Sequence, residues 1–442
     1  MKQDKRYKRL SRRVFLKLAG VAGAGVAAGP LLAACGAGAT TAPTAAPTAA
    51  ATAAATAAPT AVPTVAPTLA PTAGAPLKIG VLLPYSDIYA VLGESITEAM
   101  KMYFESVGNT AGGRPIELIT EDEGTKPDEA LQKARKLVEQ DQVDLVAGIV
   151  SSGVAAACRD YFDETQNILI IANAGANALT RAAKSKYIFR ASFSNWQPNW
   201  PLGTWAFENV GKKVAISVPD YGAGHDMEKA FINSFSAAGG EIIKTQYTPF
   251  PQMGDPAPFI TELADAGADL IYAFYSGAAA VAFVKAYGDF GLTGQVPFVC
   301  AGFAVEEDVL PSQGDAALGA KSGLHWALNL DNEVNKKFTA DYKARTTKNA
   351  NVFAVQGYDT ARVIAEAVNA TQGDTSDKDK LVEAIAGVTF DGPRGAFKFD
   401  PNTHNVIQHI YIRDVQKVGD ELHNVILKDV GEVVDPGDDS LG

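Results

Sequence analysis

The chain is poor in cysteine, histidine and positive charge. Its 442 residues include three Cys and five His, and 50 Asp/Glu outnumber 39 Lys/Arg. Three cysteines are too few for a disulfide scaffold or a cysteine-rich zinc site. Residues 1–34 hold eight Lys/Arg and one acidic residue, so the remainder has a formal charge of −18. An acidic chain without a basic tract matches nucleic-acid phosphates poorly, which excludes nucleic acid as a main partner.

Several catalytic and membrane patterns are also missing. After residue 34 the chain has no H-E-x-x-H pair, no G-x-S-x-G elbow and no G-x-x-x-x-G-K-[ST] loop. No uncharged apolar run of transmembrane length follows residue 34 either. We therefore expect no enzymatic activity, no metal, no cofactor and no bilayer-spanning segment after residue 34.

The first 35 residues carry two targeting motifs. Residues 11–17 (S-R-R-V-F-L-K) resemble a twin-arginine export signal with its pair at Arg12 and Arg13, and residues 32–35 (L-A-A-C) resemble a bacterial lipobox. The apolar stretch between them is too short and too rich in Ala and Gly for a transmembrane helix. The resemblance implies a signal peptide at 1–34 and a lipid on Cys35. The protein would then be anchored outside the cytoplasm, in a periplasm or at the outer cell surface.

An uncharged stretch follows the lipobox. Residues 36–76 consist mainly of Ala, Thr and Pro and contain no Asp, Glu, Lys or Arg. Such a sequence cannot bury enough apolar surface to fold. We therefore expect residues 35–76 to be a lipidated cysteine followed by a linker.

From residue 77 onward, short apolar runs alternate with amphipathic stretches. Continuous apolar strands separated by helices are typical of parallel sheets covered on both faces. Two such series predict an α/β fold of two doubly wound parallel-sheet lobes, in which ligands bind beyond the carboxyl ends of the strands. The predicted strands are 77–83, 116–121, 143–150 and 168–172 in the first series, and 213–218, 241–248, 270–275 and 296–300 in the second.

Four segments near the predicted strand ends carry recognisable motifs. They are K-I-G-V-L-L-P-Y-S (78–86), V-A-G-I-V-S-S-G (146–153), D-Y-G-A-G (220–224) and Q-G-Y-D (356–359). In this order they resemble the periplasmic binding protein type 1 family, and more closely its Leu/Ile/Val-binding members that feed ABC transporters. The likeness covers about residues 77–430. It implies two lobes, joined by a three-stranded hinge, that close over a small molecule.

The resemblance also implies domain boundaries and partners. Lobe 1 would comprise 77–191 and 328–390, lobe 2 would comprise 192–327 and 391–432, and 433–442 would be a flexible tail. An ABC permease with its ATPase subunits would receive the ligand from a monomeric binding protein. The competing function is a ligand-sensing receptor subunit of a signalling system, which the binding domain alone does not distinguish from transport.

Ser151 and Ser152 stand between a predicted strand and a predicted helix. Backbone N–H groups at a helix N-terminus, with nearby hydroxyls, suit a carboxylate, although a Ser here can also act simply as an N-cap. In the family the next loop continues this cradle. Here that loop reads N-A-G-A-N (173–177), so Ala174 and Ala176 would offer amides while the usual Thr hydroxyl is absent.

Aromatic residues are expected to form the walls of the site. Tyr221 stands where the family presents an aromatic lid, and Tyr275 and Ser276 end the next cleft strand. Aromatic residues at helical spacing lie in a core as often as in a site, so the remaining wall candidates rest on position alone. They are Tyr85, Tyr89, Leu92 and Phe353.

The loop around Gly302 and Phe303 departs from the family pattern. Amino-acid-binding members place an acidic residue in this loop to meet the ligand's ammonium group. Neither Gly302 nor Phe303 can pair with a cation, and burying an unpaired ammonium is costly. We therefore expect a small carboxylate, either an amino acid or an amine-free aromatic or organic acid, and the departure favours the second.

Overall fold

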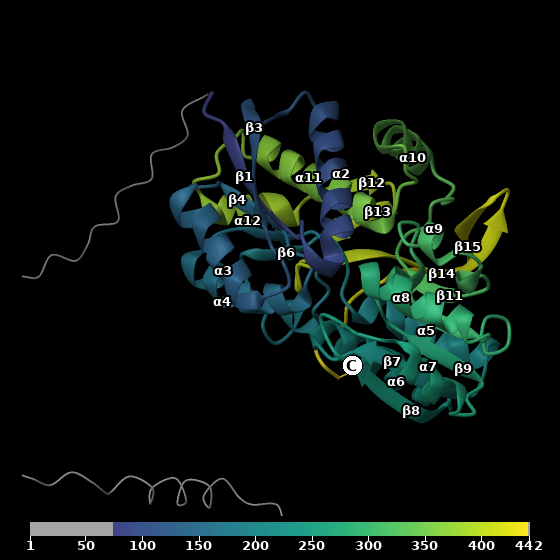
Figure 1. Cartoon of the computed structure of the whole chain (residues 1–442). Helices are drawn as coiled ribbons and strands as arrows, with labels where there is room; N and C mark the ends of the chain where they lie inside the picture. Colours follow the sequence, from purple (N-terminus) through teal and green to yellow (C-terminus); the bar gives the residue numbers. More distant parts are fainter. Residues whose placement is uncertain (1–73, 441–442) are drawn as a thin grey trace, which may run out of the picture. The chain divides into compact units, whose positions relative to one another are not determined.

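The computed structural model describes residues 74–440 (Figure 1). The predicted signal with Arg12 and Arg13, the predicted lipid-attachment residue Cys35 and the linker as far as residue 73 lie outside the described residues. No helix within 74–440 has both the length and the apolar character that a membrane crossing requires.

The first sheet has six strands in the order β2-β3-β1-β4-β5-β6. All neighbours are parallel except the short β2–β3 hairpin. This sheet and its helices are called the first lobe below. The strands are β1 (Leu77–Leu83), β2 (Thr110–Ala111), β3 (Arg114–Asp122), β4 (Leu145–Gly148), β5 (Leu169–Ile171) and β6 (Ile188–Arg190).

Helices cover both faces of the first sheet, because side chains that alternate along β1 belong to two different apolar clusters. Ile79 and Val81 of β1 belong to one apolar cluster with α2 (Ala90–Ser106) and α11 (Val352–Ala370). Leu82 belongs to another cluster with α3 (Pro127–Arg135) and α4 (Ser152–Thr165). Since successive strand residues point to opposite faces, the continuous apolar run of β1 is what a sheet covered on both sides requires.

The second sheet has nine strands in the order β12-β13-β14-β11-β10-β9-β7-β8, with β15 paired to β14. The run from β8 to β11 is parallel and β11 through β15 pair antiparallel. This parallel part with its helices is the second lobe. Its strands are β7 (Lys213–Pro219), β8 (Glu241–Thr248), β9 (Leu270–Ala273), β10 (Phe298–Ala301) and β11 (Lys321–Leu324).

Helices cover both faces of this sheet as well. Val214 and Ile216 share a cluster with α5 (Trp196–Asn209) and α6 (Gly222–Ala237). Ala215 shares one with α7 (Ala257–Ala264) and α8 (Gly277–Asp289). The remaining helices are α9 (Leu310–Gln313), α10 (Glu333–Thr346) and α12 (Lys378–Ala386). The predicted α/β class, with two parallel-sheet lobes, is confirmed.

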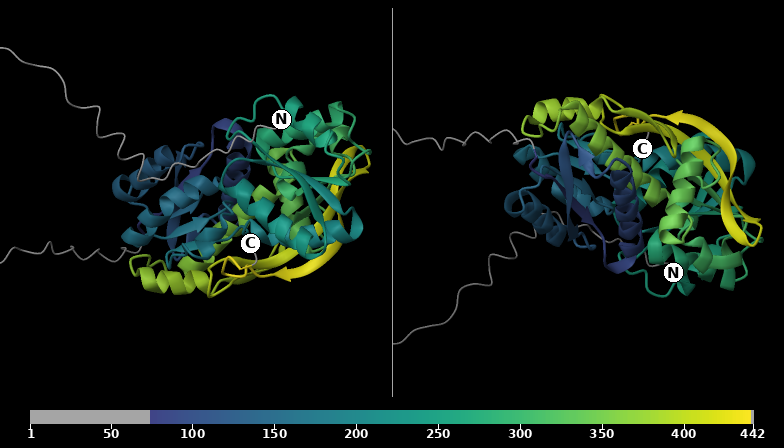
Figure 2. Two further views of the ribbon diagram at one scale, coloured as in Figure 1. Left: turned by 90° about the horizontal axis from the view of Figure 1, so that it is seen from below. Right: turned by 90° about the horizontal axis from the view of Figure 1, so that it is seen from above.

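The antiparallel strands near the C-terminus connect the two lobes. They are β12 (Thr389–Gly392), β13 (Gly395–Phe399), β14 (Val406–Val418) and β15 (Glu421–Val433). β14 pairs with β13 at one end and with β11 of the second lobe at the other, and Figure 2 shows this yellow ribbon running along both lobes. The β12–β13 hairpin packs against α11 of the first lobe, where Arg394 and Asp359 form a fully buried ion pair of 2.6 Å. The predicted boundary at 390/391 therefore falls inside a hairpin that contacts the first lobe.

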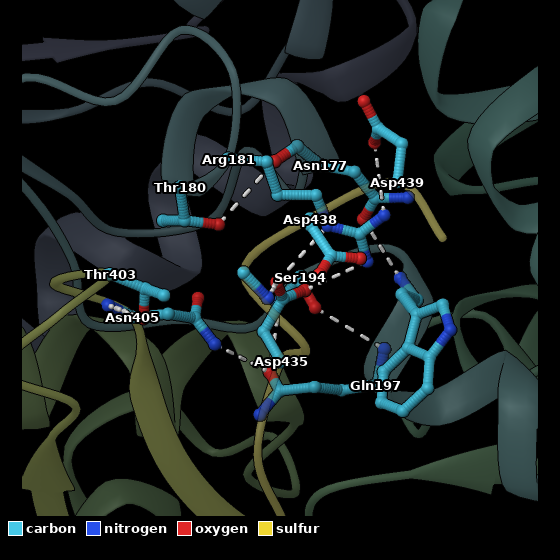
Figure 3. Close-up of polar contacts among 12 residues, drawn as sticks. Asn177, Thr180, Arg181, Ser194, Gln197, Thr403, Asn405, Asp435, Asp438 and Asp439 are labelled. Carbon is cyan, nitrogen blue, oxygen red and sulfur yellow. Dashed lines mark hydrogen bonds and ion pairs between the residues drawn. The ribbon is translucent and has the colours of Figure 1, made fainter. Parts of the chain in front are cut away.

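The segment after β15 returns to the connection between the lobes. Asp435 is buried and forms an ion pair of 3.1 Å with the fully buried side chain of Arg181, and Asp439 lies 3.2 Å from the same guanidinium (Figure 3). A buried guanidinium needs a buried counter-charge. The described part of the predicted flexible tail, 433–442, is therefore held to the first lobe by this ion pair.

Candidate functional site

One pocket lies where the loops after the strands of both sheets meet. It contains about 310 Å³ of space not filled by atoms, part of which is open to solvent. Its lining follows β1, β4, β5 and β6 of the first sheet and β7, β9 and β10 of the second, with one residue from the start of α11. The lining residues are Tyr89, Leu92, Val150, Ser152, Asn173, Gly175, Phe193, Asn195, Tyr221, Ala223, Met227, Phe274, Ser276, Phe303 and Phe353.

The described residues that line this pocket include none with a charge. Six of the fifteen are aromatic, and the polar side chains besides the two tyrosines are Ser152, Asn173, Asn195 and Ser276. An apolar, aromatic lining with a few convergent polar groups is the usual composition of a small-molecule site. The arrangement suits a flat ring that carries a small number of polar substituents.

Seven of the thirteen residues predicted for the ligand site line this pocket. They come from five separate loops and from the start of α11, and the structure brings them together. They are Tyr89, Leu92, Ser152, Tyr221, Ser276, Phe303 and Phe353.

Three predicted residues do not line the pocket, although the residue that follows each of them in the sequence does. They are Ser151, Tyr275 and Gly302. Ser151 directs its backbone N–H to Glu123 Oε1 at 2.7 Å. Tyr275 turns away, and its hydroxyl lies 2.7 Å from that of Ser217. The carbonyl of Gly302 accepts a hydrogen bond of 3.2 Å from Arg413.

The other three predicted residues have structural contacts in the first lobe. Ala174 belongs to the apolar cluster between the first sheet and its helices α3 and α4. The carbonyl of Ala176 accepts a hydrogen bond from Arg190. The hydroxyl of Tyr85 lies 2.7 Å from Thr97 Oγ1. None of the three is among the residues that line the pocket.

Eight lining residues were not predicted from the sequence. Phe274 and Ser276 both line the pocket while Tyr275 does not. Side chains alternate along this extended segment, so Phe274 and not Tyr275 is the aromatic residue that faces the pocket. Phe193 and Asn195 follow β6, directly after the predicted lobe boundary at 191/192, where no ligand contact was expected. Of the remaining residues, Met227 lies outside the motifs and loops singled out in the sequence, and the others lie within them but were not selected: Val150, Asn173, Gly175 and Ala223.

The start of α4 is where a carboxylate fits best. The backbone N–H groups of Val150 and Ser151 both donate to the buried carboxyl of Glu123 at 2.7 Å. Burial raises the pKa of Glu123 to about 8, although the two N–H bonds favour its ionised form. The following N–H groups, from Ser152 onward, belong to the first turn of the helix and have no intrahelical acceptor. Of the anion site expected at Ser151 and Ser152, only Ser152 and the other N–H groups of the first turn have free donors, because the N–H of Ser151 is bound to Glu123.

The two lobes meet over the pocket at a pair of tyrosines. Tyr89 Oη and Tyr221 Oη are 3.1 Å apart. The ring of Tyr221 stacks on Phe250 with centroids 4.0 Å apart and planes 4° apart. Burial raises the pKa of both hydroxyls well above the usual value for tyrosine. They therefore act as neutral donors and acceptors and add no charge to the site.

A second polar bridge links the lobes through Asp226 of α6. Its Oδ2 accepts the backbone N–H of Asn177, in the first lobe, at 2.8 Å. The same atom accepts a hydrogen bond of 3.2 Å from Asn195 Nδ2. One carboxylate oxygen of the second lobe therefore binds both Asn177 of the first lobe and Asn195, which follows β6.

The acids close in sequence to Phe303 have other partners. Glu306 is fully buried and pairs with Arg413 at 2.9 Å, and it also accepts the backbone N–H of Val352. Glu307 pairs with His423 at 3.0 Å. Neither residue is among those that line the pocket. No group of three or more His, Cys, Asp or Glu within residues 74–440 could hold a metal ion.

Comparisons with known proteins agree with this geometry. The family model described as "Periplasmic binding protein" matches residues 76–420. "Leu/Ile/Val-binding protein homolog 6" of Brucella melitensis is 31% identical over 367 residues, which cover 82% of this chain and 93% of that protein.

Solved structures give a similar result. A solute-binding protein of an ABC transporter from Rhodopseudomonas palustris, in complex with 3,4-dihydroxybenzoic acid, is 33% identical with a TM-score of 0.79. A second such protein from R. palustris, in complex with benzoate, is 35% identical with a TM-score of 0.78. Each match covers 82% of this chain and 99% of the other.

Proposed function

Because the chain belongs to the periplasmic binding protein family, we propose that it captures an aromatic carboxylate outside the cytoplasmic membrane and delivers it to an ABC permease. It is a solute-binding protein of the branched-chain amino acid type. The ligand class, the closure of the lobes and the lipid anchor are the parts that we propose beyond this family membership.

The lining of the pocket carries the proposal for the ligand. Six aromatic side chains surround a space without charged groups, and aromatic rings pack favourably against such walls. The N-terminus of α4, with the Ser152 hydroxyl, supplies donors for one carboxylate. The neighbours that share 33% and 35% of their residues with this chain hold 3,4-dihydroxybenzoic acid and benzoate.

An amino acid fits the same pocket less well. Its ammonium group needs a carboxylate or several acceptors, because an unpaired buried charge is strongly unfavourable. Glu306 is engaged by Arg413 and Asp226 by two N–H donors. The amine-free acid that the sequence favoured is therefore also the ligand class that this geometry favours.

Closure of the lobes follows from the contacts across the pocket. The Tyr89–Tyr221 and Asp226–Asn177 hydrogen bonds join the two lobes, which supports the proposal that the lobes close over a ligand. A ligand that contacts both lobes stabilises the closed state by its differential affinity. The closed complex would then dock on the permease, while a lipid on Cys35 and the linker to residue 76 keep the monomeric protein at the membrane.

A thermal-shift and calorimetric screen tests the proposal. The protein is first unfolded and refolded to remove any co-purified ligand, then mixed with benzoate, hydroxybenzoates, leucine and valine. A ligand at a hundred times its dissociation constant adds about 2.7 kcal/mol to the free energy of unfolding. We expect the aromatic acids to stabilise and leucine and valine to have no effect. Stabilisation by leucine or valine alone would contradict the ligand class.

A further inference from the structure

A buried hydrogen-bond acceptor in the pocket has no partner within the chain. Asn195 is 0% exposed and lines the pocket, and its Oδ1 has no hydrogen-bond partner among the described residues. Buried polar side-chain atoms in folded proteins are nearly always paired, and an exception calls for an explanation. A donor on a bound ligand would satisfy an acceptor in this position.

The orientation of the Asn195 amide is fixed by its neighbours. Its Nδ2 donates to Asp226 Oδ2 at 3.2 Å, and its backbone N–H donates to the carbonyl of Gly175 at 2.7 Å. A flipped amide would bring Oδ1 against the Asp226 carboxylate, which offers no donor when ionised. The amide oxygen is therefore the atom left without a partner.

Close packing keeps this oxygen in place. A Cβ atom at Gly175 would overlap Oδ1 of Asn195, and it would come within 2.6 Å of the Phe193 ring. Both neighbours line the same pocket. The amide thus has a glycine on one side and an aromatic wall beside it, while the bond to Asp226 sets which end of the amide is the oxygen.

We infer that Asn195 determines specificity by accepting a hydrogen bond from a ring substituent, so that the preferred ligands are hydroxylated aromatic carboxylates. The inference rests on the proposed function, since it assumes an aromatic acid. Ionised benzoate has no N–H or O–H donor, whereas a ring hydroxyl has one. A site built to bond a hydroxyl discriminates strongly against the analogue that lacks it, because the buried acceptor is then left unpaired.

The test compares ligands of similar size on the full-length protein. Dissociation constants are measured by calorimetry for 3- and 4-hydroxybenzoate, and for 3- and 4-methylbenzoate, in which a methyl group replaces the hydroxyl. We expect the better hydroxybenzoate to bind at least about tenfold more tightly than its methyl counterpart. In Asn195→Leu this ratio should fall below about threefold. Tyr85→Phe, which alters a hydroxyl outside the pocket lining, should keep it.

A second variant guards against a folding defect in Asn195→Leu. Asp226→Asn keeps Asn195 but allows its amide to flip, and the same ratio should fall. Equal binding of methyl- and hydroxybenzoates by the unaltered protein would overturn the inference and leave the proposed function standing. So would a preference for hydroxybenzoates that survives in both variants. If leucine binds and no aromatic acid does, the proposed function fails as well.

Discussion

Tyr89 and Tyr221 come from different lobes, and their hydroxyl oxygens are 3.1 Å apart over the pocket. Both side chains also line the pocket. The same pair therefore covers the ligand site and connects the lobes. Since Tyr221 is stacked on Phe250, its ring is held in place for this contact from within the second lobe.

Removing either hydroxyl should weaken ligand binding through the loss of this bond. A typical hydrogen bond contributes about 0.5–1.5 kcal/mol net, so Tyr89→Phe and Tyr221→Phe should each raise the dissociation constant about three- to tenfold. The double variant should lose less than the sum of the two, because both changes remove one shared bond. Calorimetry on the four proteins measures this coupling.

Tyr85→Phe is the matched control for this cycle. Its hydroxyl bonds Thr97 within the first lobe, so its loss should leave ligand affinity unchanged. Fully additive effects of Tyr89→Phe and Tyr221→Phe would show that the two hydroxyls act separately on the ligand.

A side chain at residue 277 should hold the lobes apart. Gly277 begins α8 with a φ of +57°, and a Cβ there would overlap the backbone carbonyl of Ile88 in the first lobe. Gly277→Ala should therefore weaken ligand binding at least tenfold and increase the radius of gyration of the ligand-saturated protein in small-angle scattering.

Gly291→Ala separates this contact from backbone strain. Gly291 has a φ of +72° and no heavy atom within 4 Å of the added Cβ, so both variants share the cost of a positive φ in an L-residue. Gly291→Ala should lower stability yet bind ligand normally. Equal losses of affinity in the two variants would contradict the role of Gly277 as a contact between lobes.

Ser152 and Ser151 should differ sharply in their effect on carboxylate binding. The Ser152 side chain lines the pocket at the first turn of α4, and Ser151 does not line it. A hydrogen bond to a charged group contributes about 1.5–3 kcal/mol, so Ser152→Ala should weaken binding of an aromatic carboxylate about tenfold or more. Ser151→Ala should leave the affinity within about twofold. The reverse order would place the anion at Ser151.

Glu123 should make the protein less stable as the pH rises. Burial raises its pKa from 4.5 to about 8, so between these values the folded protein holds a proton that the unfolded chain has lost. The free energy of unfolding therefore falls as the pH rises from about 4.5 to about 8 and then levels off. Urea unfolding at several pH values should show a shallower decline in Glu123→Gln than in the unaltered protein.

Glu121→Gln is the control for this pH dependence. Burial opposes ionisation of Glu121, but hydrogen bonds from Lys136 and Lys133 are sufficient to lower its pKa. Its contribution therefore has the opposite sign, and Glu121→Gln should not make the decline shallower. A pH profile unchanged in Glu123→Gln would show that Glu123 does not titrate between pH 4.5 and 8.

The fold could be predicted because, along most of the chain, the pattern of apolar residues distinguishes buried strands from amphipathic helices. Several elements were not predicted, among them β6, β11 and α5. For α5 the reason is that Pro198 and Pro201 lie within its range, and proline inside a helix is unfavourable. Pro198 stands in the first turn, where proline is tolerated, but Pro201 lies further inside. Helix α5 is retained because Leu202 and Ala206 bury against the second sheet, which outweighs local propensity.

The site could be predicted to the level of loops but not of individual side chains. Strand ends fix which loops meet, and together with the family resemblance they led to Ser152, Tyr221 and Phe303, which line the pocket. Whether Ser151 or Ser152 faces the ligand depends on Glu123, which lies 28 residues before Ser151 and occupies its N–H. The unpaired oxygen of Asn195 has no signature in the sequence, because it arises from packing among distant segments.

All fifteen pocket residues stand in loops, in short helical turns or in the first two turns of longer helices, and none belongs to a strand. The sheets are therefore separate from the surface that contacts the ligand, whereas Tyr89, Tyr221 and Asn195 both line the pocket and take part in the contacts between the lobes. Substitutions at pocket positions that make no contact between the lobes can therefore change which molecule is bound while leaving the two sheets unaltered. A binding protein built in this way can thus acquire a new ligand through a few loop substitutions, which gives this architecture a high capacity to evolve.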